Sequence, residues 1–346
     1  MSQNLQNLAK KEGGMLAFFR RQFRIHPTPL PAGTDLAGRT VIITGGSGGL
    51  GVEASRQFLR LHPAHLIVTV RSQSKGDALT AKLRKEFPHS TISAWLLDME
   101  SYESIQGFVE QCKTLSRIDI VVLNAGLQKD TFERVEATGH EGTVQVNYIS
   151  TALLAILLLP VLRSASDSST PGSKPPLLSI VSSDTAYWAK FDLNKPFIPQ
   201  FDNPKTFSPT HYQKSKLLLF WFIVKLSELV PADNVTVNLT NPGLTAGTDL
   251  NKDMFSKLNP VLNAVLSRLK GAVARTIEDG ASNYIYATVV KGKESHGSYV
   301  SDWKFQPYPA VVYGAKGNKA KEQLWEETIK ELEFADVASI VQQVAR

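Results

Sequence analysis

The chain has 346 residues, 42% hydrophobic and 20% charged, with a formal net charge of +6 and one cysteine, Cys112. This composition supports one large folded domain or two small ones, and it excludes disordered and fibrous proteins. The lone cysteine excludes an internal disulfide framework and a cysteine-cluster metal site. Because no His-Glu-x-x-His spacing occurs, we expect no bound metal. Because no basic stripe with interleaved aromatics occurs, we expect no nucleic acid partner.

The first 37 residues form a basic extension, in which five basic residues against two acidic ones give a net charge of +3. Phe18, Phe19 and Phe23 lie in the same segment. We expect a helix packed on the main domain, and a peripheral helix on a membrane surface is the weaker alternative.

The longest apolar stretch, residues 152–162, is shorter than the roughly 20 residues that cross a bilayer. The N-terminus shows no secretory signal pattern. We therefore expect a cytoplasmic protein without a transmembrane segment.

From residue 38 onward, short β-branched runs alternate with helical segments at the spacing of βαβ units. The predicted strands are residues 40–44, 65–70, 91–97, 118–123, 177–182, 235–240 and 298–300. The predicted helices are residues 49–61, 75–86, 102–115, 138–162, 210–230 and 277–289. Because continuous apolar strands suit a sheet covered on both faces, the predicted fold class is α/β. It is a single Rossmann-type, doubly wound parallel sheet of about seven strands with helices on both faces, preceded by the N-terminal helical extension.

Two segments interrupt this alternation, and long irregular insertions are usually functional. We assign residues 38–303 to the Rossmann-fold domain and residues 304–346 to a C-terminal helical tail. Within the domain, residues 184–208 form an insertion rich in proline and aromatics, and residues 244–270 form an apolar substrate lid.

A glycine-rich turn directly follows the first predicted strand and opens a helix. In this context glycines let backbone N–H groups approach a pyrophosphate at the positive end of the helix dipole. The predicted cofactor contacts here are Thr44, Gly45, Ser47, Gly49, Leu50 and Gly51.

The end of the second strand selects the dinucleotide. Binding of NAD typically uses an acidic residue there, but no Asp or Glu occurs between residues 54 and 76, and the strand ends in Arg71. A guanidinium at this point pairs with the 2′-phosphate of NADP(H), with Lys75 as a second candidate. Asp98 ends the third strand, where a carboxylate can accept from the adenine amino group. Asn124, Ala125 and Gly126 end the fourth, where small residues leave room for the ribose.

Tyr212 and Lys216 lie four residues apart and therefore share one face of a predicted helix. A phenol with an ordinary pKa near 10 is a poor acid-base catalyst at neutral pH, and a neighbouring ammonium favours the phenolate. This pair can move a proton beside a bound cofactor.

Together, these motifs and their order resemble the short-chain dehydrogenase/reductase family over residues 38–303. They run from the glycine turn through Asp98, Asn124-Ala125-Gly126, Asn147, Ser182-Ser183, Tyr212-x-x-x-Lys216 and Asn241-Pro242-Gly243. The chain is most similar to the retinol-dehydrogenase-like branch, and especially to fungal members of secondary metabolism.

The resemblance implies a catalytic set of Tyr212 as proton donor, Lys216 as its partner and nicotinamide-ribose ligand, Ser183 on the substrate oxygen, and Asn147 holding a relay water. The insertion separates the serines from Tyr212, so spacing does not exclude Ser182. The resemblance also places Pro242, Gly243 and Thr245 at the nicotinamide carboxamide. The family usually has a threonine a few residues further on, whose hydroxyl contacts the same carboxamide. Here that position holds Gly247, so either Thr248 takes its place or the hydroxyl contact is absent.

The apolar lid and the six aromatics of the insertion suggest that the substrate is a bulky hydrophobic small molecule. The six aromatics are Tyr187, Trp188, Phe191, Phe197, Phe201 and Phe207. The alternative is that these rings pack the insertion onto the domain. The family resemblance implies a polyketide-like or terpenoid ketone as substrate, and retinoid-type or steroid-type substrates are the second choice. A nucleotide-binding protein with a non-redox role is the competing hypothesis. Homodimers formed through the two long helices are common in the family.

Overall fold

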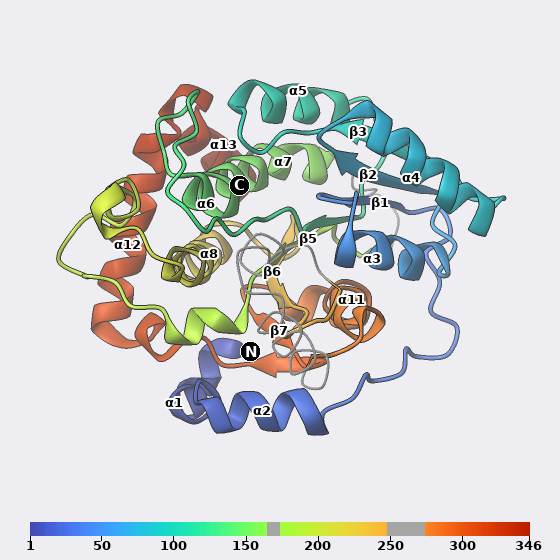
Figure 1. Cartoon of the computed structure of the whole chain (residues 1–346). Coiled ribbons are helices and arrows are strands. Elements are labelled where there is room, and N and C mark those ends of the chain that lie inside the picture. The colour runs from blue at the N-terminus through green and yellow to red at the C-terminus, as the bar shows by residue number, and fades with distance from the viewer. Residues whose placement is uncertain (165–173, 248–273) are drawn as a thin grey trace, which may run out of the picture.

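The computed structural model describes residues 1–164, 174–247 and 274–346. Within them, one sheet has the strand order β3-β2-β1-β4-β5-β6-β7-β8 (Figure 1). The strands are β1 (Thr40–Ile43), β2 (His65–Val70), β3 (Ile92–Leu96), β4 (Ile120–Leu123), β5 (Leu177–Val181), β6 (Thr236–Asn241), β7 (Tyr299–Ser301) and β8 (Lys304–Gln306). Strands β1 to β7 pair in parallel, and β8 pairs antiparallel with β7. The order reverses between β1 and β4, where ligands of doubly wound sheets bind.

Helices cover both faces of the sheet, which explains why its strands are apolar without alternation. The helices are α3 (Gly49–Leu59), α4 (Gln73–Glu86), α5 (Tyr102–Cys112), α7 (Ser150–Ser164), α8 (Thr210–Leu229) and α11 (Ile277–Ile285). In β1, Ile42 packs toward the core formed with α5, α7 and α8, while Val41 and Ile43 pack toward the core formed with α3, α4 and α11. The predicted α/β fold with a doubly wound sheet is confirmed.

Two local features differ from the sequence prediction. The single helix expected over residues 138–162 is divided into α6 (Gly142–Val144), a π-helical turn (Gln145–Ile149) and α7. Strand β8 was not predicted, and it extends the sheet beyond residue 303 into the segment expected to be a tail.

Among the described residues, one helical stretch is long and apolar enough to cross a membrane, Gly142–Ser164, with a mean hydropathy of 1.8. Its most apolar window is 94% buried inside the protein. This stretch is therefore a core helix.

The C-terminal helices α12 (Gly314–Glu331) and α13 (Val337–Ala345) pack against α8 and α7. Trp325 of α12 stacks on Phe222 of α8 with ring centroids 6.1 Å apart. The Thr328 hydroxyl lies 2.5 Å from the hydroxyl of Tyr148. The two long helices expected at a dimer interface are thus covered on these faces by the chain's own C-terminus.

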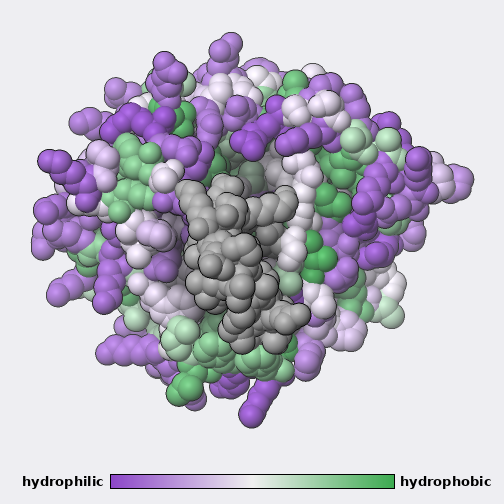
Figure 2. Space-filling view, viewed as in Figure 1, coloured by the Kyte–Doolittle hydropathy of each residue, from purple (hydrophilic) through white to green (hydrophobic). Residues whose placement is uncertain are grey.

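The N-terminal extension also packs on the domain. It forms a 3-10 segment (Ser2–Leu8), α1 (Ala9–Glu12) and α2 (Met15–Arg24), which lie beside β7 and β8 at one end of the sheet (Figure 1). Ser2 is fully buried, and its Oγ accepts a 2.9 Å bond from the backbone N–H of Tyr299 in β7. Apolar residues gather at the lower edge of the view in Figure 2, where α2 lies, and Leu16 of that helix is 89% exposed.

Candidate active site

The glycine-rich turn joins β1 to α3 at the switch point of the sheet. A Cβ on Gly51 would lie 2.4 Å from the carbonyl oxygen of Gly45, so only glycine allows this close approach. The N-terminus of α3 follows Gly48 without a side-chain cap. A phosphate bound there would meet no competing side chain. Of the other predicted contacts in this turn, Ser47 is exposed and Leu50 half-buried.

Two predicted cofactor residues, Thr44 and Asn124, hold this turn in shape. The Thr44 hydroxyl is buried and accepts a 3.0 Å bond from the backbone N–H of Ala125. The Asn124 amide donates to the carbonyl oxygens of Thr44 at 2.9 Å and Gly45 at 3.3 Å. Its Oδ1 accepts from the hydroxyl of Tyr284 at 3.0 Å. Tyr284, which sequence reasoning missed, therefore braces the turn through Asn124.

The predicted adenosine-end residues lie at the carboxyl ends of β2 and β3. Arg71 is exposed and makes no hydrogen bond or ion pair with any described residue, and Lys75 on α4 is also exposed. Asp98 is half-buried, and its Oδ1 accepts a 3.0 Å bond from the backbone N–H of Glu100. Arg71 can therefore bind an added phosphate without breaking an existing contact.

Tyr212 and Lys216 lie on the first turns of α8. The Lys216 ammonium is buried, donates to the carbonyl oxygen of Val181 at 2.8 Å and lies 5.7 Å from the centroid of the Tyr212 ring. Burial lowers the pKa of Lys216 to about 8, because the charged ammonium loses water. Burial raises the pKa of Tyr212 to about 12, and a hydrogen bond with Ser183 opposes this rise. Both groups therefore carry their protons at neutral pH.

The two serines after β5 have different surroundings. Ser182 is buried and donates to the backbone carbonyl of Lys216 at 3.2 Å. Ser183 is half-buried and lies beside the Tyr212 phenol. Its Oγ accepts bonds from the backbone N–H and the hydroxyl of Thr185, at 3.2 and 3.0 Å. Because both Thr185 groups donate, the hydroxyl proton of Ser183 is available to another acceptor.

Asn147 lies in the π-helical turn between α6 and α7, and such turns are frequent at functional sites. Its Nδ2 donates to the carbonyl of Leu127 at 2.8 Å and to the Ser215 hydroxyl at 3.0 Å, while its Oδ1 accepts from Leu127 N–H at 2.8 Å. Both amide hydrogens are thus engaged. A Cβ on Gly126 would lie 3.1 Å from this Oδ1 and 3.5 Å from Lys216 Nζ, so Gly126 allows these groups to meet.

The loop after β6 contains Pro242, Gly243 and Thr245. Thr245 is buried, donates to the carbonyl of Gly243 at 3.2 Å and contacts Gly280 of α11. Residues 248–270 of the predicted lid, which include Thr248, lie outside the described residues.

The aromatics of the insertion mostly bind it to the rest of the chain. Phe197 and Phe201 are fully buried, and Phe197 packs against Trp221 with centroids 5.2 Å apart. The Trp188 indole donates to the carbonyl of Gly13 at 2.9 Å, and Tyr187 donates to that of Pro307 at 2.5 Å. These contacts favour the packing alternative for the insertion over a substrate-binding role.

Comparison with known proteins gives three findings. A family model described as short chain dehydrogenase matches residues 39–170. The chain is 46% identical to short chain dehydrogenase virL of Hypocrea virens over the full length of both chains, and 46% identical to short chain dehydrogenase/reductase mfmJ of Annulohypoxylon moriforme over 94% of this chain and 93% of that one.

Solved structures share the fold at low sequence identity. L-sorbose reductase from Gluconobacter frateurii, solved with NADPH and L-sorbose, superposes with a TM-score of 0.59 at 19% identity, covering 81% of this chain and 99% of that one. A short chain dehydrogenase from Shigella flexneri complexed with NADP superposes with a TM-score of 0.55 at 21% identity, covering 78% of this chain and 100% of that one.

Proposed function

The chain belongs to the short chain dehydrogenase family, and we propose that it is an NADP(H)-dependent oxidoreductase acting on the carbonyl or alcohol of a bulky hydrophobic small molecule. The observation that carries this proposal is that the Tyr212 phenol lies beside the Ser183 hydroxyl and one helical turn from the buried Lys216 ammonium, whose Nζ is 5.7 Å from the centroid of the Tyr212 ring. A proton donor and a second hydroxyl that converge on one point are what polarisation and protonation of a carbonyl oxygen require.

The residues at the switch point fit a nicotinamide dinucleotide. Gly51 and the uncapped N-terminus of α3 would hold the pyrophosphate, and Asp98 would accept from the adenine amino group. Arg71 would pair with the 2′-phosphate, which favours NADP(H) over NAD(H). Pro242, Gly243 and Thr245 would lie along the carboxamide. Relatives of this fold solved with NADP or NADPH support the assignment.

When bound, NADPH would supply a hydride to the carbonyl carbon, and the residues of this chain would supply the matching proton. Tyr212 donates its phenolic proton to the carbonyl oxygen, which becomes the alcohol. Ser183 donates a hydrogen bond to the same oxygen and stabilises the charge that develops there. Lys216 keeps two ammonium hydrogens beyond its bond to Val181, and these would bind the nicotinamide ribose and restore the Tyr212 proton.

Tyr212 is suited to act as the acid of the reductive direction. Burial raises its pKa to about 12, so it is a neutral phenol at pH 7 and can give up a proton. We propose a ketoreductase, with a place in secondary-metabolite biosynthesis supported by the full-length likeness to fungal short chain dehydrogenases.

The test is NADPH oxidation by the purified protein against a panel of hydrophobic ketones, with polyketide-like and terpenoid members, and with Tyr212→Phe as the control. We expect Tyr212→Phe to lower kcat by about 10²- to 10⁴-fold while NADPH still binds. Undiminished turnover in Tyr212→Phe would remove Tyr212 as the acid. Tight NADPH binding without turnover of any ketone would favour a non-redox role.

A further inference from the structure

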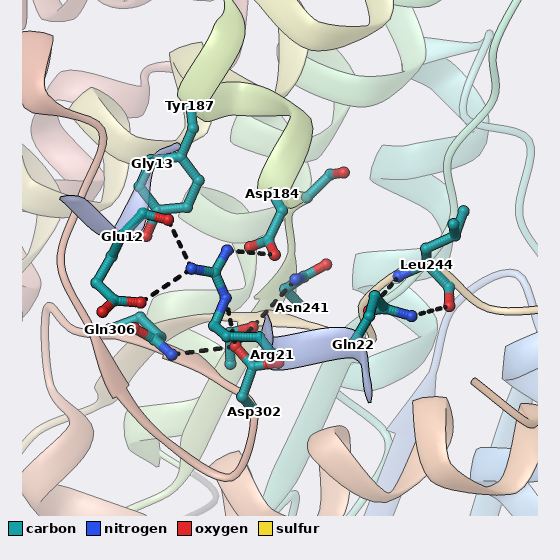
Figure 3. Close-up of polar contacts among 12 residues, drawn as sticks. Glu12, Gly13, Arg21, Gln22, Asp184, Tyr187, Asn241, Leu244, Asp302 and Gln306 are labelled. Atoms are coloured by element: carbon teal, nitrogen blue, oxygen red, sulfur yellow. Dashed lines mark hydrogen bonds and ion pairs between the residues drawn. The ribbon is translucent and has the colours of Figure 1, made fainter. Parts of the chain in front are cut away.

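One turn of helix α2 contacts the chain just beyond three adjacent strands of the sheet. Strands β5, β6 and β7 are neighbours, and the residues that follow them include Asp184, Leu244 and Asp302 respectively. Arg21 contacts the first and third of these residues, and Gln22 contacts the second (Figure 3). Helix α2 therefore reaches the same edge of the sheet that carries Ser183 and the Pro242-Gly243 loop.

Arg21 is one of the largest buried side chains in the described part of the protein, at 2% exposure. Its Nη2 donates to Asp184 Oδ2 at 3.0 Å, and its Nε lies 3.1 Å from Asp302 Oδ2. Its Nη1 donates to the carbonyl oxygen of Glu12 at 2.6 Å and to Glu12 Oε2 at 3.1 Å. The planar guanidinium thus joins three carboxylates in three directions, which a lysine ammonium cannot reproduce.

Asp184 connects this network to the proposed catalytic serine, because it is the residue after Ser183. Its second carboxylate oxygen accepts a 2.6 Å bond from the hydroxyl of Tyr299 in β7. Burial raises the pKa of Asp184, and the Arg21 charge opposes that rise. Since both carboxylate oxygens are engaged and the group is buried, Asp184 has little freedom to move, and the backbone that carries Ser183 is held with it.

Gln22 is hydrogen-bonded to the loop after β6 through one residue, Leu244. Its Nε2 donates to the carbonyl oxygen of Leu244 at 2.8 Å, and its Oε1 accepts from the N–H of Leu244 at 3.3 Å. Gly243, with φ of +77°, allows the approach, because a Cβ there would lie 2.9 Å from Gln22 Oε1 and 2.7 Å from Arg275 Nη1. Arg275 completes the network by donating to the carbonyl oxygen of Arg21 at 3.1 Å and pairing with Asp302.

We propose that Arg21 and Gln22 are positioning residues of the active site. Arg21 fixes Ser183 through Asp184, and Gln22 fixes the nicotinamide-binding loop through Leu244. This inference rests on the proposed function. It assigns the N-terminal extension a part in the reaction, and it requires that the two residues affect different steps.

For Gln22, the test compares two ligands that share only the adenosine end of the site. Gln22→Leu removes both bonds to Leu244 and keeps a side chain of similar size. We expect the Kd for NADPH to rise by about tenfold, the value of one to two lost hydrogen bonds, while the Kd for 2′,5′-ADP stays unchanged. Equal losses for both ligands, or no loss for either, would overturn the role of Gln22.

For Arg21, the test is a matched pair of substitutions on adjacent helix positions. Arg20 pairs only with Glu12 among the described contacts, and its side chain is 42% exposed. Arg21→Lys should lower kcat by about ten- to a hundredfold through misplacement of Ser183, with the Kd for NADPH little changed. Arg20→Lys should leave kcat at the wild-type value. A kcat for Arg21→Lys equal to that of Arg20→Lys would overturn the role of Arg21.

Binding of 2′,5′-ADP also separates the failures. A variant that does not fold binds neither ligand, whereas equal but measurable losses in Gln22→Leu overturn the role of Gln22. Arg21→Lys is compared where 2′,5′-ADP still binds with wild-type affinity, and Asp184→Asn replaces it if that variant does not bind this ligand. If the wild-type protein binds neither NADPH nor 2′,5′-ADP, the proposed function fails. If it binds both and the Arg21 and Gln22 variants behave as wild type, only the positioning role fails.

Discussion

The hydroxyl of Ser182 donates to the backbone carbonyl of Lys216 at 3.2 Å, so this serine joins β5 to helix α8. The next residue, Ser183, contacts the Tyr212 phenol instead. Two adjacent hydroxyls therefore have different partners, and their removal should have different consequences.

Ser183→Ala should lower kcat by about 10²- to 10³-fold, because a donor to the developing oxyanion is lost. Ser182→Ala should change kcat much less and should mainly lower the melting temperature, since its hydroxyl bonds backbone. Steady-state kinetics and thermal unfolding of both variants measure this. A larger kcat loss in Ser182→Ala would assign the substrate contact to that residue.

The pH dependence of ketone reduction should follow Lys216. Its pKa is lowered to about 8, so the ammonium form dominates below that pH and is lost above it. We expect kcat/KM for reduction to be level below about pH 8 and to fall as pH rises further. Tyr212, with a pKa of about 12, stays protonated throughout this range. In Lys216→Arg, whose side chain stays charged, any remaining activity should show no fall near pH 8. A fall at the same pH in that variant would contradict the assignment.

Arg71→Glu should raise the KM for NADPH by about ten- to a hundredfold and leave the KM for NADH nearly unchanged, because only NADPH carries the 2′-phosphate. Lys85→Glu makes the same charge change at an exposed position near the far end of α4 and is the matched control. Equal losses for NADPH and NADH in Arg71→Glu would contradict the 2′-phosphate role.

The C-terminal helices should contribute to stability as part of the core. Leu324 of α12 is 1% exposed and belongs to the core shared with α7 and α8. Leu324→Ala should lower the free energy of unfolding by about 2–5 kcal/mol, measured by urea denaturation. Glu326→Ala, at an exposed position on the same helix, should have little effect. A loosely attached tail would instead tolerate both changes equally.

The sequence predicted the parallel part of the sheet well, because each strand is an apolar run bounded by helical periodicity. Strand β8 lacked such a signal. It has three residues, and the turn before it uses Asp302 and Trp303 at φ of +55° instead of the glycine or asparagine that usually marks a hairpin. Helix periodicity likewise gave no sign of the π-helical turn around Asn147, since the apolar pattern continues through it.

For the site, the sequence predicted that Tyr212 and Lys216 share a helix face, because this follows from their spacing. The choice between Ser182 and Ser183 depends on how the 29 residues up to Tyr212 fold, which spacing alone does not fix. In the sequence, Arg21 is only one of the five basic residues of the N-terminal extension. Its partner Asp184 lies 163 positions away, and no local pattern in one sequence reveals such a pair.

The N-terminal extension, with its buried residues Ser2 and Arg21, has a practical consequence for anyone who produces this protein. A fragment trimmed to residue 39, where the family model begins, would lack Arg21 and leave the buried Asp184 facing no cation among the described residues. It would also lack Ser2, whose Oγ accepts a hydrogen bond from the backbone N–H of Tyr299 in β7.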